Sequence, residues 1–143
     1  MTVVLDASVI LKWLLADPQR GRETDRATAL MGAVAGGEIP ILQPFHWLAE
    51  VIAVLARLSP DSVIEDALML RAMEIPTSDE ASVLRRASSI AVETGQHVFD
   101  TLYHAVALEN DQAVLITADE RYLERAHQYG CVVALAAWQQ DKR

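Results

Sequence analysis

Three short apolar runs, separated by stretches of helical periodicity, limit most strongly the folds open to this chain. The runs TVVLD (residues 2–6), AVLIT (113–117) and CVVAL (131–135) are rich in β-branched residues. They are continuously apolar, whereas a strand exposed on one face alternates apolar with polar residues. The pattern predicts an α/β fold with a parallel sheet covered by helices on both faces.

Helical periodicity fills the chain between these runs. Ser8 is the expected cap of the first helix, which leaves Asp6 without a structural role. Short apolar segments at 39–42 and 74–76 are weaker strand candidates, since each contains or adjoins a proline. The expected helices span residues 9–16, ending near Asp17-Pro18, and residues 24–34, 45–57, 61–72, 78–92, 97–108 and 119–128.

Composition narrows the class of protein. A length of 143 residues, with 52% hydrophobic and 22% charged residues, predicts a single folded domain over residues 1–143. The chain contains no run of about 20 uncharged apolar residues, so no membrane span is predicted. The N-terminus lacks the basic segment of a signal peptide. The single cysteine, Cys131, fits a reducing cytoplasm.

The net charge argues against simple electrostatic binding of nucleic acid. Twenty acidic residues against twelve basic ones give a net charge of −8, and an acidic surface repels phosphate backbones. A nucleic-acid role is compatible with this charge only where bound cations and a few local bases reverse the sign at the site. Solubility alone explains the same charge.

Two acids stand at the ends of apolar strands. Asp6 ends the first run, and Asp119 follows AVLIT by two residues. Ligands of an open parallel sheet bind beyond the carboxyl ends of its strands, so these carboxylates would converge if the two strands are neighbours. Helix capping explains Asp119 equally well, because Thr117 and Glu120 match the ends of a capping box.

Two further acids interrupt apolar helical segments. Glu50 lies in HWLAEVIAVLARL, where a lone shielded carboxylate is costly unless it is paired, protonated or bound to a metal. Arg57 is too far along the helix to pair with it. Asp100 lies in HVFDTLYHAVAL. An edge position that reaches solvent is the alternative for Glu50, and a first-turn acid favoured by the helix dipole is the alternative for Asp100.

The four acids together suit a hard, oxygen-preferring cation. Carboxylates favour Mg²⁺ or Mn²⁺, and two such ions about 4 Å apart activate water and stabilise the leaving oxygen in phosphodiester hydrolysis. The chain contains no glycine-rich phosphate loop, no zinc-type His or Cys motif and no serine-nucleophile motif.

Four segments together resemble the PIN-domain ribonucleases, and among them the VapC-type toxins of toxin–antitoxin pairs. The segments, in order, are VVLDASVILKWLL, PFHWLAEVIAVL, FDTLYHAVAL and LITADERYL. The resemblance implies a three-layer α/β/α sandwich with a parallel sheet of order 3-2-1-4-5. It also implies a Mg²⁺- or Mn²⁺-dependent endoribonuclease that leaves a 3′-hydroxyl and a 5′-phosphate.

The same resemblance assigns roles to particular residues and partners. The motif acids fall on Asp6, Glu50, Asp100 and Asp119, and the hydroxyl residues beside the metal fall on Ser8 and Thr117. The family implies an RNA substrate, a homodimer and a cognate antitoxin that covers the site.

The chain departs from its relatives beside the helical glutamate. Ala53 stands where relatives often carry Asn, and the bulky pair His46-Trp47 has no evident role. Among secondary candidates, Lys12 and Arg121 are the best placed to contact phosphate. His104, one turn after Asp100, is expected to pack or hydrogen-bond, and a metal-activated water needs no such base.

Two other functions compete with the nuclease. A receiver-like signalling module is also α/β, acidic and Mg²⁺-binding, but it needs a lysine after a late strand, and AVLIT is followed by Ala118-Asp119. A catalytically inactive PIN-like scaffold is the second alternative, and it has no need to bind metal at the four acids.

Overall fold

Three parallel strands lie at the centre of the computed structural model, which describes residues 1–15 and 22–140. Their order is β1-β4-β5, with Leu5 opposite Ile116 and Thr117 opposite Ala134. The three predicted strands are therefore confirmed, although the last is shorter than expected because Cys131 has a left-handed φ of 54°. The bounds are β1 Thr2–Leu5, β4 Ala113–Thr117 and β5 Val132–Ala134.

Two further strands form a separate small parallel sheet, β2 (Gln43–Pro44) with β3 (Thr77–Ser78). The strands predicted at 39–42 and 74–76 were therefore placed too early. In the first of these segments only Ile41 forms a bridge, to Val3 of β1. The structure divides the sheet in two and does not show one continuous sheet of order 3-2-1-4-5.

A side chain takes the place of main-chain pairing between β1 and β2. The buried Gln43 accepts a hydrogen bond from the Leu5 amide at 2.7 Å through Oε1 and donates one to the Leu5 carbonyl at 2.8 Å through Nε2. The next residue, Pro44, has no N–H to continue a ladder. The gap between the two sheets is therefore closed by an amide side chain.

Seven α-helices in the described residues follow the predicted pattern within a few residues. The expected end of the first helix at Ala16 and Asp17-Pro18 lies outside the described residues. Two short 3₁₀ turns, His127–Tyr129 and Leu135–Ala137, flank β5. The helices are α1 Ala7–Leu14, α2 Arg22–Ala35, α3 Trp47–Leu58, α4 Val63–Ala72, α5 Ala81–Thr94, α6 Val98–Leu108 and α7 Glu120–Ala126.

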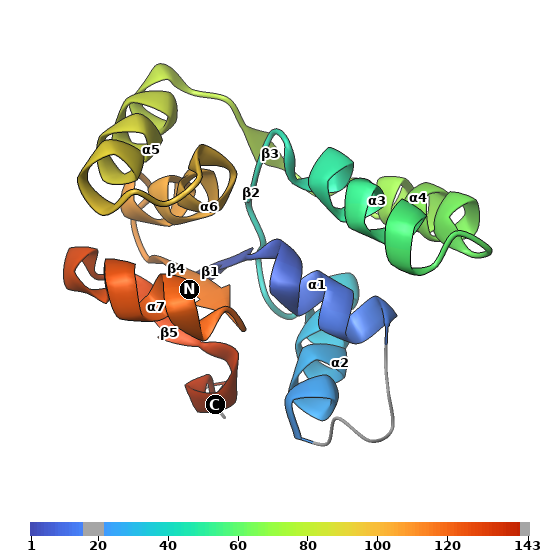
Figure 1. The fold of residues 1–143 in the computed structure, drawn as a ribbon. Helices are drawn as coiled ribbons and strands as arrows, with labels where there is room; N and C mark the ends of the chain where they lie inside the picture. The colour runs from blue at the N-terminus through green and yellow to red at the C-terminus, as the bar shows by residue number, and fades with distance from the viewer. Residues whose placement is uncertain (16–21, 141–143) are drawn as a thin grey trace.

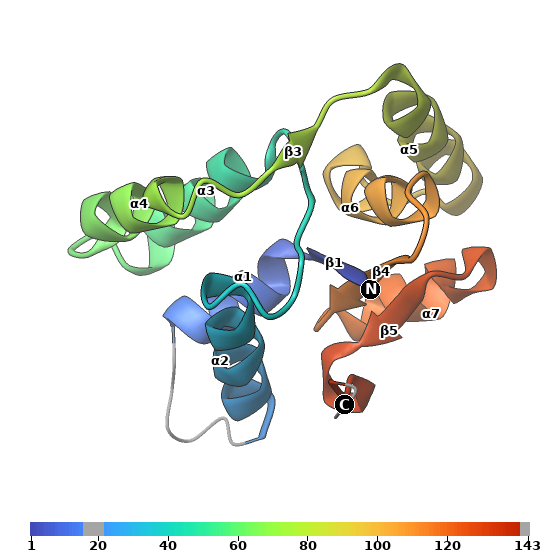
Figure 2. The same cartoon turned by 180° about the vertical axis from the view of Figure 1, so that it is seen from behind.

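The helices cover the sheet from two sides. α6 packs on β1, β2 and β4 with α5 against it, and α5 also contacts α7 (Figure 1). α1 contacts β1, β4 and α2. α3 and α4 form a hairpin that projects away from the strands in both views (Figures 1 and 2). None of the helices described here is long and apolar enough to cross a membrane.

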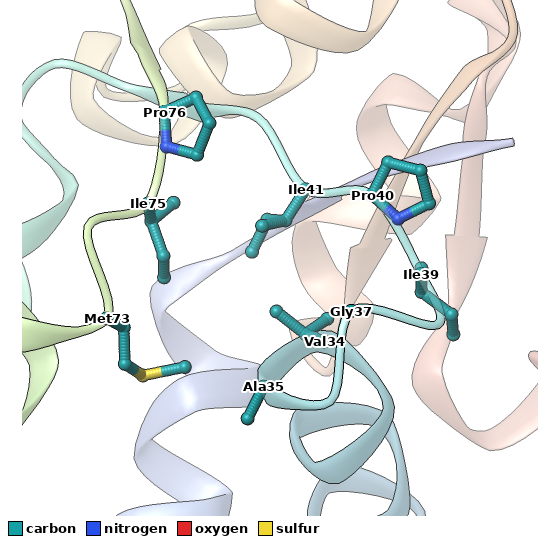
Figure 3. A pocket seen from close by; sticks show the side chains of 9 residues that line it. All are labelled: Val34, Ala35, Gly37, Ile39, Pro40, Ile41, Met73, Ile75 and Pro76. Carbon is teal, nitrogen blue, oxygen red and sulfur yellow. The ribbon is translucent and has the colours of Figure 1, made fainter.

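An apolar hollow of about 450 Å³ opens at the amino ends of β2 and β3. Figure 3 shows Val34, Ile41, Met73 and Ile75 turned toward one another around it. No ionisable side chain lines this hollow, and ligands of parallel sheets bind at the opposite, carboxyl ends of the strands. It belongs to the packing between the α2 end and the segment that leads from α4 into β3.

Candidate functional site

Asp6 begins the site at the carboxyl end of β1. It is the N-cap of α1, since its side chain accepts a hydrogen bond from the Ser8 amide at 3.3 Å. The expectation that Ser8 would cap this helix and leave Asp6 without a structural role is therefore wrong. The Asp6 side chain is also nearly buried, with 9% of its residue surface exposed. A buried carboxylate needs partners, and two hydroxyls supply them.

Those hydroxyls join the ends of β1 and β4. Ser8 Oγ donates to Asp6 Oδ2, and Thr117 Oγ1 donates to the same oxygen at 3.2 Å. Ser8 Oγ in turn accepts from the Ala118 amide at 3.0 Å, and Thr117 Oγ1 accepts from the Asp119 amide at 3.0 Å. β1 and β4 are neighbours, as the convergence of Asp6 and Asp119 required. Among the described residues these side-chain bonds reach only Oδ2, leaving Oδ1 for another ligand.

Asp119 is the N-cap of α7, where its Oδ1 accepts from the Tyr122 amide at 3.1 Å. The capping alternative at this position is therefore confirmed, but the cap is Asp119 itself and not Thr117. One carboxylate oxygen is used by the cap. The side chain is half-buried, and its second oxygen makes no hydrogen bond among the described residues.

Glu50 is held by two aromatic side chains that the sequence did not identify. The Tyr103 hydroxyl donates to Oε1 at 3.0 Å, and His46 Nε2 lies 3.6 Å from Oε2. The Glu50 side chain is 18% exposed, which confirms the expected shielding. His46 precedes Glu50 by four residues, a spacing that signals a contact on a helix. Tyr103 is 53 residues away along the chain and left no such signal.

Asp100 lies in the first turn of α6, which His97 caps. The first-turn alternative proposed from the sequence is confirmed. The same turn places Phe99 beside the acid, with its carbonyl accepting from His46 Nε2 at 2.9 Å. His46 therefore links the start of α6, which carries Asp100, to Glu50 on α3.

The pKa values show that the acids influence one another. Burial raises the pKa of Asp6 from 3.8 to about 6, opposed by the Ser8 hydrogen bond and reinforced by the charges of Asp100 and Glu50. Burial also raises the pKa of Asp100, followed by the charges of Glu50 and Asp119. The nearby histidines only partly oppose that rise. We call Asp6, Glu50, Asp100 and Asp119 the four-acid site.

The two tyrosines of the site remain protonated donors. Burial, and then the charge of Glu50, raises the pKa of Tyr103 far above its usual range. Burial also raises the pKa of Tyr122, with Asp100 and Asp6 adding to the effect. Neither phenol can therefore act as a base at neutral pH. Their role is to donate hydrogen bonds and to fix the side chains around them.

The donor chemistry of the four-acid site fits a divalent cation. Burial and then the charges of neighbouring carboxylates raise the pKa of Asp6 and of Asp100, and a hard cation would neutralise that concentration of negative charge. In the part of the chain that the structure describes, no three His, Cys, Asp or Glu side chains already converge on one point. The negative charge of the carboxylates therefore attracts a cation, but the side chains do not yet surround one position. A bound cation would have to draw them together.

The remaining sequence candidates have mixed positions. His104 is fully buried and bonds to Tyr122 at 2.9 Å and to the Gly130 carbonyl at 2.7 Å, which confirms its packing role. Lys12 pairs with Glu23 at 3.0 Å, and Arg121 is exposed on α7. Neither base lies among the charges that act on the pKa of Asp6 or Asp100. Their contact with phosphate stays a prediction.

Comparison with known proteins gives one family. The family model described as the PIN domain matches residues 3–128. That span covers most of the chain and contains every residue of the four-acid site. The comparison with curated proteins found no match.

Proposed function

The chain belongs to the PIN-domain family, a family of metal-dependent nucleases, and we propose that it is a Mg²⁺- or Mn²⁺-dependent endoribonuclease. The observation that carries the proposal is the nearly buried Asp6, joined by two hydroxyls to the end of β4, with a pKa raised by burial and then by the charges of two other acids. A carboxylate in that position destabilises the fold unless a cation or a proton compensates it. The receiver-like alternative does not apply to a member of this family.

Each residue of the site has a proposed part in the reaction. Asp6, Glu50, Asp100 and Asp119 hold the metal and its water. When bound, the metal supplies a water of lowered pKa and neutralises charge on the phosphate. Ser8 and Thr117 fix one oxygen of Asp6, so that the other is aimed into the site. The products would be a 3′-hydroxyl and a 5′-phosphate.

Tyr103 and His46 orient Glu50 in the same way. Tyr103 donates a hydrogen bond to Oε1, and His46 Nε2, which is bonded to the Phe99 carbonyl, lies 3.6 Å from Oε2, so both partners limit how the carboxylate can turn. Metal-binding groups depend on such supporting partners for both orientation and basicity. The supported Glu50 would also compensate for Ala53, which offers no amide to the site.

We further propose that the protein is a single-domain cytoplasmic toxin with a cognate antitoxin. The −8 net charge and the four-acid site favour a partner that inserts a basic side chain. The α3–α4 hairpin exposes large apolar side chains suited to a homodimer, with exposed fractions of 58% at Leu58, 73% at Ile64 and 62% at Leu68. We expect Lys12 and Arg121 to contact RNA phosphates.

The family strand order 3-2-1-4-5 is also part of the proposal. The Val3–Ile41 bridge and the Gln43 side chain hold β2 beside β1. The pairing of β3 with β2 and of β4 with β1 supports this proposed order, although the strands belong to two separate sheets.

RNA cleavage tests the proposal directly. Wild-type protein and Asp6→Asn would be incubated with single-stranded RNA in Mg²⁺, in Mn²⁺ and in excess chelator. We expect cleavage by wild type only with metal, and loss of at least about 100-fold in Asp6→Asn. Equal cleavage by both proteins would remove Asp6 from the mechanism.

A calorimetric titration with Mn²⁺ separates the nuclease from the inactive scaffold. Heat of binding that disappears in Asp6→Asn supports the four-acid site. A protein that folds normally, binds no Mn²⁺ and cuts no RNA would instead be a scaffold. Val92→Ala, an exposed position on α5, is the matched control that should bind as wild type does.

A further inference from the structure

A hollow of about 280 Å³ lies beside Glu50, between α3 and the start of α6. Ala49 and Ala53 are one helical turn apart on the exposed face of α3, and their small side chains leave the space open. Phe99 and His46 form its aromatic wall, and Arg57 lies at its far end. The hollow therefore runs from a carboxylate of the four-acid site to a guanidinium.

Phe99 is the exposed part of the aromatic wall, and its main chain is hydrogen-bonded on both sides. Phe99 has an exposed fraction of 50%, unusual for a phenylalanine beside two carboxylates. Its amide donates to His97 Nδ1 at 3.1 Å, and its carbonyl accepts from His46 Nε2 at 2.9 Å. The rings of His46 and Phe99 lie 5.3 Å apart. The main chain that carries the Phe99 ring is thus held in place before a ligand arrives, which lowers the entropy cost of binding.

We propose that this hollow binds one unpaired base of the RNA substrate, stacked on Phe99. The inference rests on the proposed nuclease function and names a subsite for it. Base stacking on aromatic side chains is the usual means by which proteins hold single strands without reading sequence. A base in the hollow has its phosphate on the side of Glu50, where the four-acid site acts.

Size and charge favour a base over a larger ligand. The volume lies just below the range of pockets that enclose drug-sized molecules, so a single ring system is the ligand that fits. Arg57 is exposed and makes no ion pair among the described residues. In a chain with a net charge of −8, it offers a contact for the next phosphate along the strand.

Fluorescent RNA provides the test. The four homopolymer RNA decamers would be titrated with protein by anisotropy, with Ca²⁺ in place of Mg²⁺ to slow hydrolysis. 2-Aminopurine, whose emission is quenched by stacking, would then be placed at each position of the best-bound decamer. The variants are Phe99→Ala, which removes the wall, and Ala53→Leu, which fills the hollow from its exposed side. Val92→Ala is the control.

We expect quenching at one or two adjacent positions in wild type and in the control. Phe99→Ala should abolish that quenching and weaken binding by about 5- to 150-fold, the equivalent of 1–3 kcal/mol for one stacked base. Ala53→Leu should also abolish the quenching, which excludes a general effect of losing an aromatic ring. Normal thermal unfolding of both variants would show that they are folded.

Two results overturn the inference. Unchanged quenching and unchanged RNA affinity in both variants would show that no base enters the hollow. The same conclusion would hold if the two variants weakened only the binding of a protein partner. RNA cleavage that depends on Asp6 would then leave the nuclease function standing. If wild type neither binds nor cuts any decamer while folded, the proposed function fails and the subsite fails with it.

Discussion

Replacing Asp6 by Asn should stabilise the metal-free protein at alkaline pH while abolishing its activity. The amide oxygen of Asn can still accept from Ser8 and Thr117, as Oδ2 of Asp6 does. The substitution removes only the negative charge that burial and the neighbouring acids oppose. Stability and function are therefore expected to change in opposite directions.

The magnitude follows from the pKa of Asp6. Its rise from 3.8 to about 6 on folding means that the folded state binds the proton more tightly. The resulting stabilisation is fully present below pH 3.8 and is lost as the pH rises through 6. Because a change of one in a pKa is worth about 1.4 kcal/mol, wild type should lose about 2–3 kcal/mol between pH 4 and pH 8 from this group.

Urea unfolding of wild type and Asp6→Asn at pH 4 and pH 8, in chelator, measures the effect. The quantity to compare is the gap, meaning the difference in free energy of unfolding between Asp6→Asn and wild type, at the two pH values. Any cost of the Asn amide that does not depend on pH cancels in this comparison. We expect the gap to move by about 2–3 kcal/mol in favour of Asn at pH 8. Added Mn²⁺ should reverse it by stabilising wild type alone. A gap independent of pH would refute the buried-carboxylate argument.

Three further perturbations test other parts of the structure. Tyr103→Phe removes the hydrogen bond to Glu50 and should lower Mn²⁺ affinity about 10- to 100-fold in calorimetry; an unchanged affinity would mean that Tyr103 does not orient Glu50. Gln43→Leu leaves the Leu5 amide and carbonyl without partners and should cost about 2–4 kcal/mol in urea unfolding, whereas a loss below about 0.5 kcal/mol would contradict the bridging role. Ile64→Asp should convert a dimer into monomers in sedimentation analysis, and an unchanged mass would place the dimer face elsewhere.

The sequence was sufficient for features that depend on local pattern. Continuous β-branched runs identified β1, β4 and β5, because a strand buried on both faces has no polar alternation. Helical periodicity identified the helices within a few residues, and prolines and glycines marked their ends. The short strands β2 and β3 were misplaced, because a strand of two residues next to a proline shows too little periodicity to be recognised in the sequence.

Tertiary structure decided what each acid does. From sequence alone Asp6 had no structural role, whereas the fold makes it a helix cap, a hydroxyl acceptor and the most strongly perturbed acid of the site. The cap and the Ser8 bond are local, but the Thr117 bond depends on β4 lying beside β1, a contact between residues 111 positions apart. Glu50 likewise depends on Tyr103, which only the packing of α6 against β1 and β2 brings within reach.

The sequence thus determined which residues carry charge into an apolar fold, and the tertiary structure determined how that charge is held. A carboxylate among apolar neighbours is visible in the chain because its desolvation has to be compensated by something. The compensating groups are Ser8 and Thr117 for Asp6, and Tyr103 and His46 for Glu50; Thr117 and Tyr103 come from separate elements, β4 and α6. The contacts of Ser8 and His46 are local, whereas those of Thr117 and Tyr103 exist only once the strands and helices have packed, because hydrogen bonds act over about 3 Å whatever the distance along the chain.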